Sequence, residues 1–372
     1  MRPAGAAVAL AALLPLLLAA GAAASDAAVA PPAAEPAYYS ARYRLVGTLC
    51  QGVVLAVGLA GNLLVVAVVC GARSMRSPTN CYLVSLAVAD CLVLVASVPN
   101  EIASYYLVGN QWLWGDAGCA AFVFSQNLGI NASALSLVAF TVERYVAICR
   151  PLRSHALRSV ARARRVSLLA WAAAAAYSAP WLLLAATRPL RYRGLPELRA
   201  CAFRLERARY LPYFLCDLLL FYAAPLLLCC VLYALIARAL FRRAALAASG
   251  GAGLSPHASA AGVDARCQVV RMLAAVVAAF AALWLPYRGL LVYNSFATLL
   301  SGDKYMDLWF LLFAKTCVFV NSAINPILYN AMSAKFRRAF RRALLRCTRR
   351  AAAAAAPADG PLSGSGGTRL MV

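Results

Sequence analysis

The chain has 372 residues, of which 63% are hydrophobic and 13% are charged. A soluble globular domain carries about 45–50% apolar and about 25% charged residues. This composition excludes a disordered chain, a collagen-like chain and an ordinary soluble enzyme, and it indicates a protein surrounded by lipid. The net charge of +23 is explained more simply by basic cytosolic loops of a membrane protein than by nucleic-acid binding, so no nucleic-acid partner is expected.

The first 24 residues are typical of a cleavable signal peptide. Arg2 precedes an apolar run from Ala6 to Ala20, and small residues follow at positions 22–24. An uncleaved anchor helix is the alternative for this segment. Residues 25–45 contain prolines among alanines, which predicts a short extracellular segment that packs no core of its own.

Seven apolar stretches that follow are each long enough to cross a bilayer. They cover residues 46–70, 79–107, 116–149, 163–186, 210–240, 268–300 and 306–331. Stretches of this length in lipid must be helices, because every backbone polar group needs a partner within the chain. We therefore predict an all-α fold in which residues 46–331 form a seven-transmembrane helix bundle.

The basic residues predict how this bundle is oriented. The segments on one side of the membrane hold 22 Lys and Arg residues, and those on the other side hold 10. This asymmetry predicts a multi-pass plasma-membrane protein with its N-terminus outside and its C-terminus in the cytosol.

The C-terminal part carries two further signals. Residues 332–347 place apolar residues at helical spacing between arginines, which predicts a short amphipathic helix on the cytosolic membrane surface, in contact with membrane lipid. Cys347 at its end is a predicted palmitoylation site. Residues 348–372 predict a disordered cytosolic tail with few phosphorylation sites, so we expect a weak interaction with arrestin.

Polar residues in the middle of the predicted spans are the first candidates for function, since an ionisable group at that depth costs a few kcal/mol. Asp90 is the carboxylate among them, and Ser133, Asn321 and Ser322 offer further oxygens. We expect these four residues to hold a sodium ion as an allosteric ligand, and no resident cofactor. The alternative is that they only form hydrogen bonds between helices.

Cysteine placement predicts one disulfide. Cys119 falls at the outer end of the third span and Cys201 in the second outer loop. Both face an oxidising compartment, in which thiols pair.

Several motifs together resemble the rhodopsin-like (class A) G-protein-coupled receptors over residues 46–347. They are Gly61-Asn62, the run from Leu86 to Asp90, Glu143-Arg144-Tyr145, Trp171, Pro225, Tyr233, Trp284-Leu285-Pro286 and Asn325-Pro326-x-x-Tyr329. Within that family, residues 78–90, 128–133, 283–288 and 321–326 are similar to the thyrotropin-releasing hormone receptors.

This resemblance implies a receptor and not an enzyme. Its ligand would be a small extracellular peptide, thyrotropin-releasing hormone or a related one, and its partner a heterotrimeric G protein, usually Gq with phospholipase C. The implied ligand-binding residues are Asn127, Asn131, Tyr287, Arg288, Asn294 and Lys315. The implied activation switch consists of Glu143, Arg144, Tyr145, Tyr233, Phe280, Trp284, Pro286, Asn325, Pro326 and Tyr329.

Two pocket positions depart from the subfamily. Asn127 stands where a tyrosine is expected and Lys315 where an arginine is expected, and lysine does not reproduce the planar fork of arginine. A peptide receptor of the same family with a different ligand is therefore the main alternative. A seven-helix transporter is less favoured because the sequence shows no repeat, and a retinal protein because Phe319 occupies the position of the Schiff-base lysine.

Overall fold

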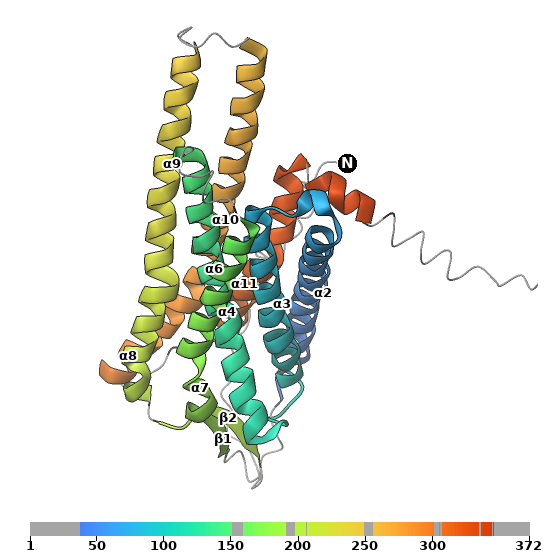
Figure 1. Cartoon of the computed structure of the whole chain (residues 1–372). Helices are drawn as coiled ribbons and strands as arrows, with labels where there is room; N and C mark the ends of the chain where they lie inside the picture. Colours follow the sequence, from blue (N-terminus) through green and yellow to red (C-terminus); the bar gives the residue numbers. More distant parts are fainter. Residues whose placement is uncertain are drawn as a thin grey trace, which may run out of the picture.

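The computed structural model describes residues 38–150, 159–190, 198–205, 207–248, 256–300, 305, 307–334, 336–343 and 345. The predicted signal peptide, Cys347 and the tail over residues 348–372 lie outside the described residues and stay predictions. Within the described part, long helices run side by side and a small hairpin covers one end of the bundle (Figure 1). We call this end the hairpin end.

The described helices of the bundle account for the predicted spans. In chain order they are α2 (Ala41–Gly71), α3 (Pro78–Ser104), α4 (Gly115–Cys149), α6 (Val160–Ser178), α7 (Trp181–Leu184), α8 (Arg207–Leu218), a π-helical turn (Leu219–Ala223), α9 (Ala224–Ala248), α10 (Pro256–Leu300) and α11 (Leu308–Met332), with a 3-10 turn (Arg73–Met75) after α2. Seven helical segments of the described chain are long and apolar enough to cross a membrane. The predicted seven-helix bundle is confirmed.

Three of the helices begin at capping side chains. Ser40, Ser77 and Asp307 precede α2, α3 and α11, and each accepts the backbone N–H of the residue three positions on, at 3.2, 3.3 and 2.6 Å respectively. Such a cap gives a partner to an N–H group that the helix itself leaves unpaired. Helix α2 therefore begins at Ala41, before the apolar boundary expected at residue 46.

The fourth span ends earlier than its apolar run suggests. Helix α6 stops at Ser178, the short α7 follows Pro180, and the chain then forms strand β1 (Ala185–Pro189). Strand β1 pairs antiparallel with β2 (Arg199–Phe203). Proline lacks the N–H that would continue the helix, and β2 supplies the backbone partners that β1 needs. The all-α prediction is correct for the bundle, but it omits this hairpin.

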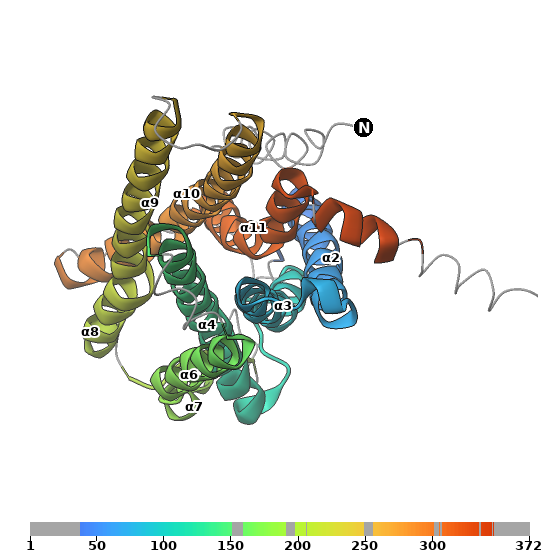
Figure 2. The ribbon, with the colours of Figure 1, turned by 45° about the horizontal axis from the view of Figure 1, so that its top comes forward.

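Helix α3 lies at the centre of one half of the bundle. It packs against α2, α4, α6 and α11, and Figure 2 shows it between α2 and α4. Gly58 of α2 permits close packing here, because an added Cβ would lie 2.6 Å from Cδ1 of Leu94 and 2.8 Å from Cβ of Ala323. Helices α2, α3 and α11 therefore pack closely at this height because residue 58 carries no side chain.

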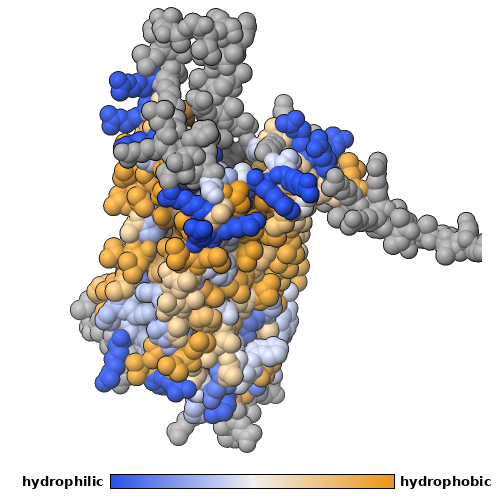
Figure 3. Space-filling model, in the orientation of Figure 1, coloured by the Kyte–Doolittle hydropathy of each residue, from blue (hydrophilic) through white to orange (hydrophobic). Residues whose placement is uncertain are grey.

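The outer surface matches a lipid environment. Hydrophobic residues cover the middle of the face shown in Figure 3, and hydrophilic residues gather towards both of its ends. Leu168 and Leu169 of α6 are each 69% exposed. A soluble protein rarely presents so continuous an apolar face, whereas a membrane bundle presents one to the acyl chains.

Residues 336–343 form a helix after α11, within the predicted amphipathic segment. Phe336 and Phe340 are buried on one side of it, while the arginines at 337, 338, 341 and 342 are exposed. The ring of Phe336 lies 5.9 Å from that of Tyr329. The apolar side of this helix therefore packs against the end of α11.

Candidate ligand pocket and activation switch

A cavity of about 470 Å³ lies between the helices near the hairpin end. Side chains of α3, α4, α8, α10 and α11 form its walls, together with strand β2. Of the predicted ligand residues, Asn127, Tyr287, Arg288 and Lys315 line it. Ligand sites commonly measure about 300–1,000 Å³, so the cavity can hold a small molecule or a peptide of a few residues.

Both cations in the cavity wall are paired with carboxylates that the sequence patterns did not reveal. Lys315 Nζ of α11 donates to Oε1 and Oε2 of Glu101 of α3, at 2.7 and 2.9 Å. Arg288 of α10 forms a buried ion pair with Asp217 of α8. The pocket therefore contains two compensated pairs and not two free positive charges.

Two predicted ligand residues do not belong to the cavity wall. Asn131 is fully buried and its Nδ2 donates to Oγ of Ser178 at 3.2 Å. It lies one turn deeper than Asn127, where α4 packs against α6, and it does not reach the cavity wall. Asn294 forms two hydrogen bonds with the backbone of Tyr305, at 2.8 and 3.0 Å. It connects the end of α10 to the segment before α11.

The hairpin forms part of the cavity wall and is held at two points. Cys119 of α4 and Cys201 of β2 form a disulfide with their Cα atoms 5.4 Å apart, which confirms the predicted bond. Oδ1 of Asp116 accepts the backbone N–H of Thr187 in β1 at 2.8 Å. Cys201 and Phe203 line the cavity, so these two links fix the position of residues that border the candidate ligand site.

A packed aromatic group connects the cavity to the centre of the bundle. Trp284 lines the cavity, and the guanidinium carbon of Arg288 lies 5.1 Å from the centre of its ring. The rings of Phe280 and Trp284 are 6.3 Å apart. Pro286 lies inside α10 next to this group, where proline weakens the helix by removing a backbone donor. Trp284 therefore belongs both to the cavity wall and to the buried core that packs around α10.

Asp90 is fully buried in the middle of α3 and receives two hydrogen bonds. Oγ of Ser133 donates to its Oδ1 at 3.1 Å, and Nδ2 of Asn325 donates to its Oδ2 at 2.8 Å. Asn321 and Ser322 are buried on α11, and the carbonyl of Ser322 accepts a hydrogen bond from Asn62 at 2.9 Å. Asn325, a predicted switch residue, is thus a direct partner of the carboxylate.

The chemistry of this polar core fits a hard monovalent cation better than a transition metal. Among the residues that the structure describes, no three His, Cys, Asp or Glu side chains gather as a metal-binding group. Asp90 provides one carboxylate, and the side chains of Ser133, Asn321 and Ser322 can offer hydroxyl and amide oxygens, which are hard ligands. Zinc would require a set of nitrogen or sulfur ligands.

Three of the predicted switch residues, Glu143, Arg144 and Tyr145, lie in the last turns of α4, at the end opposite the hairpin. Nη2 of Arg144 lies 3.9 Å from Oε1 of Glu143, and Arg144 also donates to Oγ1 of Thr79 in α3. Tyr145 is partly buried and packs against the main apolar core. These contacts connect the last turns of α4 to the first turn of α3.

Two tyrosines lie close to the same end. The hydroxyls of Tyr233 in α9 and Thr141 in α4 are 3.3 Å apart, and Tyr329 of α11 is 1% exposed. Pro326 lies inside α11. It packs closely against α2, as shown by the distance of 3.0 Å between its Cβ and the position that a Cβ on Gly61 would take. The switch candidates therefore come from α4, α9, α10 and α11, and several of them, among them Arg144, Tyr233 and Tyr329, contact another helix.

Comparison with known families decides which class this architecture belongs to. Residues 61–329 match the family described as "7 transmembrane receptor (rhodopsin family)". The chain belongs to the rhodopsin family of seven-transmembrane receptors. As a receptor of this family it is a multi-pass membrane protein of the plasma membrane and not an enzyme.

Curated relatives of this rhodopsin-family receptor support the subfamily resemblance. It is 39% identical over 320 residues to the thyrotropin-releasing hormone receptor of Gallus gallus, which covers 81% of this chain and 79% of the relative. The same receptor of Homo sapiens is 39% identical over 321 residues, covering 82% and 79%. The growth hormone secretagogue receptor type 1 of Mustela putorius furo is 35% identical over 296 residues, covering 76% of each chain.

Proposed function

We propose that this rhodopsin-family receptor binds a small extracellular peptide and signals through a heterotrimeric G protein, with thyrotropin-releasing hormone as the first ligand to test. The observation that carries the proposal is the continuity between cavity and bundle centre, since Arg288 lines the cavity and lies over Trp284. A peptide in the cavity would contact the same helix, α10, whose packing holds the bundle in its present arrangement. The names of the relatives support a peptide as the ligand class.

We also propose that the hairpin end faces the outside of the cell. The segments 71–78, 150–165, 238–271 and 332–372, which the sequence assigns to the opposite side of the membrane, together hold 22 of the 36 Lys and Arg residues of the chain, which is typical of the cytosolic side. The Cys119–Cys201 disulfide at the hairpin end is of the kind that persists in an oxidising compartment.

The mechanism we propose is a shift between two arrangements of the bundle. A ligand that binds the active arrangement more tightly increases its population. In that arrangement α10 swings outward about Pro286. The side chain of Arg144 leaves Glu143, and the side chains of Tyr233 and Tyr329 turn towards Arg144. The cleft that opens would receive the G protein, with Gq and phospholipase C as the expected route.

Calcium release in cells that express the receptor tests this function. Adding thyrotropin-releasing hormone should raise cytosolic calcium, and Tyr287→Phe should weaken the response because it removes a hydroxyl from the cavity wall. Tyr293→Phe is the matched control, since this tyrosine is 61% exposed and is not among the cavity-lining residues. A receptor that reaches the cell surface but does not respond to the hormone would contradict this choice of ligand.

A related peptide is the second candidate ligand, and the residues at positions 127 and 315 favour it. Asn127 provides no aromatic ring, and its Nδ2 already donates to the carbonyl of Val123 at 2.8 Å. Lys315 is engaged by Glu101. A panel of short amidated peptides in the same calcium assay would identify such a ligand by a lower effective concentration than that of the hormone.

A further inference from the structure

The hairpin and the residues next to it carry an excess of positive charge. Residues 188–209 contain seven arginines and two glutamates, whereas the whole chain holds 36 Lys and Arg residues in 372 positions. Basic residues normally gather on the cytosolic side of a membrane protein, so orientation does not account for this group. Four of the seven have side chains that the structure describes, and all four are exposed: Arg188, Arg199, Arg204 and Arg209.

Contacts at the hairpin bring three of these arginines together. The guanidinium of Arg188 in β1 donates to the backbone carbonyl of Arg204, which follows β2. Asp116 at the start of α4 interacts electrostatically with both Arg199 and Arg204. We call Arg188, Arg199 and Arg204 the arginine cluster.

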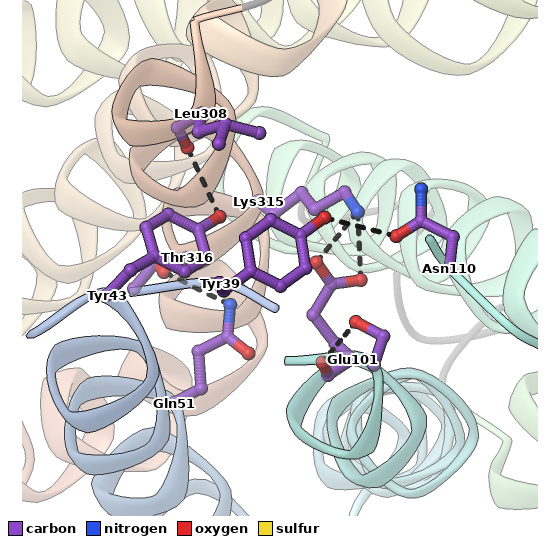
Figure 4. A network of polar contacts seen from close by, with 9 residues as sticks. Tyr39, Tyr43, Gln51, Glu101, Asn110, Leu308, Lys315 and Thr316 are labelled. Atoms are coloured by element: carbon purple, nitrogen blue, oxygen red, sulfur yellow. Dashed lines mark hydrogen bonds and ion pairs between the residues drawn. The ribbon is translucent and has the colours of Figure 1, made fainter. Parts of the chain in front are cut away.

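The positive charge of the arginine cluster is only partly compensated. Inside the cavity, Figure 4 shows the ammonium of Lys315 held by the carboxylate of Glu101. Among the residues that the structure describes, the three guanidinium groups of the arginine cluster form no such ion pair. The nearby carboxylate of Asp116 already accepts hydrogen bonds from the backbone N–H and the hydroxyl of Thr187. Three exposed positive charges therefore share one engaged negative charge.

The position and chemistry of this surface favour a polyanion outside the membrane. Figure 1 shows β1 and β2 at the very end of the bundle, away from the apolar band that faces lipid. Acidic lipids gather in the cytoplasmic leaflet, so the opposite leaflet offers few partners. A guanidinium presents a planar fork of donors that fits the oxygens of phosphate and carboxylate groups, and a sulfate group has the same tetrahedral oxygens as a phosphate. Sulfated polysaccharides of the cell surface repeat such groups along one chain, which can reach several arginines at once.

We propose that the arginine cluster is a binding surface for a sulfated polysaccharide chain of the cell surface. The inference rests on the proposed outward orientation of the hairpin end, and it does not depend on which peptide the receptor binds. Cys201 and Ala202, which lie between Arg199 and Arg204 in the sequence, line the cavity. A chain bound to the arginine cluster would therefore lie beside the candidate ligand site.

Binding of a fluorescent heparin oligosaccharide to intact cells tests this surface. The cells express the full-length receptor, and heparan lyase removes their own sulfated chains. They should bind more oligosaccharide than cells without the receptor, and added salt should weaken this binding because exposed charges are screened. The triple variant Arg188→Gln/Arg199→Gln/Arg204→Gln should bind about tenfold more weakly, which corresponds to about 1.4 kcal/mol, because exposed ion pairs are weak singly and act here as a group.

Arg42→Gln is the matched control for charge at the same end of the bundle. Arg42 is exposed in the first turn of α2 and belongs to neither strand, so its variant should keep the wild-type affinity. Surface labelling of each variant separates loss of folding from loss of binding. If the triple variant does not reach the surface, the single variants Arg199→Gln and Arg204→Gln take its place, each with about twofold weaker binding.

Two further probes separate the sulfated chain from other polyanions. Desulfated heparin of the same length should bind only weakly, and so should polyglutamate, which offers carboxylates alone. Equal binding by the wild type and the cluster variants, an equal loss in Arg42→Gln, or tighter binding of polyglutamate would overturn the inference and leave the proposed peptide receptor standing. Binding that appears only after the cells are permeabilised would contradict the proposed orientation, and the inference would fall with it.

Discussion

At the scale of single residues, the fully buried carboxylate of Asp90 is a group whose burial costs free energy unless its charge is balanced. An ionised carboxylate away from water needs a cation, a proton or a full set of hydrogen bonds. Ser133 and Asn325 each donate one hydrogen bond to the carboxylate of Asp90. We propose that a sodium ion between Asp90, Ser133, Asn321 and Ser322 balances this charge in the inactive arrangement.

The variant Asp90→Asn should therefore make agonist binding insensitive to sodium, because an amide carries no charge for the ion to balance. Agonist affinity is measured in sodium chloride and in choline chloride at equal ionic strength, for wild type and variant. Wild-type affinity that does not differ between the two salts would refute the sodium site.

A second prediction concerns the two departures in the cavity. Compared with a pocket that carries tyrosine and arginine at these positions, Asn127 lacks an aromatic contact and Lys315 lacks a planar guanidinium. Together these differences should weaken the binding of thyrotropin-releasing hormone by about 2–4 kcal/mol, or about 30- to 1,000-fold in affinity. The double variant Asn127→Tyr/Lys315→Arg should recover several-fold in potency, measured from dose–response curves. The altered-pocket hypothesis fails if potency stays at the wild-type level.

The sequence predicted which residues line the pocket better than it predicted which side chains pair with them. Motifs placed Arg288 and Lys315 in the pocket, and the structure brings both to the cavity wall. Their carboxylate partners lie 71 and 214 positions away along the chain, and helical periodicity says nothing about which side chain of another helix comes opposite. Asn131 shows the same limit, since its direction depends on where α6 packs against α4.

At the scale of helices, the close packing of α2, α3 and α11 at Gly58 can be tested by substitution. The variant Gly58→Ala should destabilise the receptor by about 1–3 kcal/mol, the usual cost of overpacking, because the new methyl group meets Leu94 and Ala323. Gly52→Ala in the same helix is the control, since its added Cβ finds no heavy atom within 4 Å. Thermal unfolding of the detergent-solubilised receptor compares the two, and equal melting temperatures would contradict the claim.

The elements themselves were predictable where lipid constrains them. An apolar stretch of spanning length can only be a helix in the bilayer, so the spans followed from hydropathy alone. The hairpin did not, because Trp181–Ala186 continues the apolar run and gives no alternation of polar and apolar residues. Its pairing with β2 depends on contacts that only the folded chain provides.

At the scale of the whole molecule, the composition of residues 348–372 bears on desensitisation. This segment holds four hydroxyl residues, Thr348, Ser363, Ser365 and Thr368, among alanines and glycines. We expect weak recruitment of arrestin after agonist addition, because few phosphates provide little charge for a basic partner. An energy-transfer assay between receptor and arrestin measures this, and rapid recruitment that survives alanine replacement of all four residues would count against it.

The doubly anchored hairpin has a consequence for the time course of signalling. Because the disulfide and the Asp116–Thr187 hydrogen bonds fix β1 and β2 to α4, we expect the two strands to stay in place at the cavity while ligands enter and leave. Because the fixed strand β2 borders the cavity, related agonists meet the same rigid wall as they enter, and we expect them to associate at similar rates. Differences in their affinity then lie in the dissociation rate, and the duration of a response reports the residence time of each agonist in the cavity.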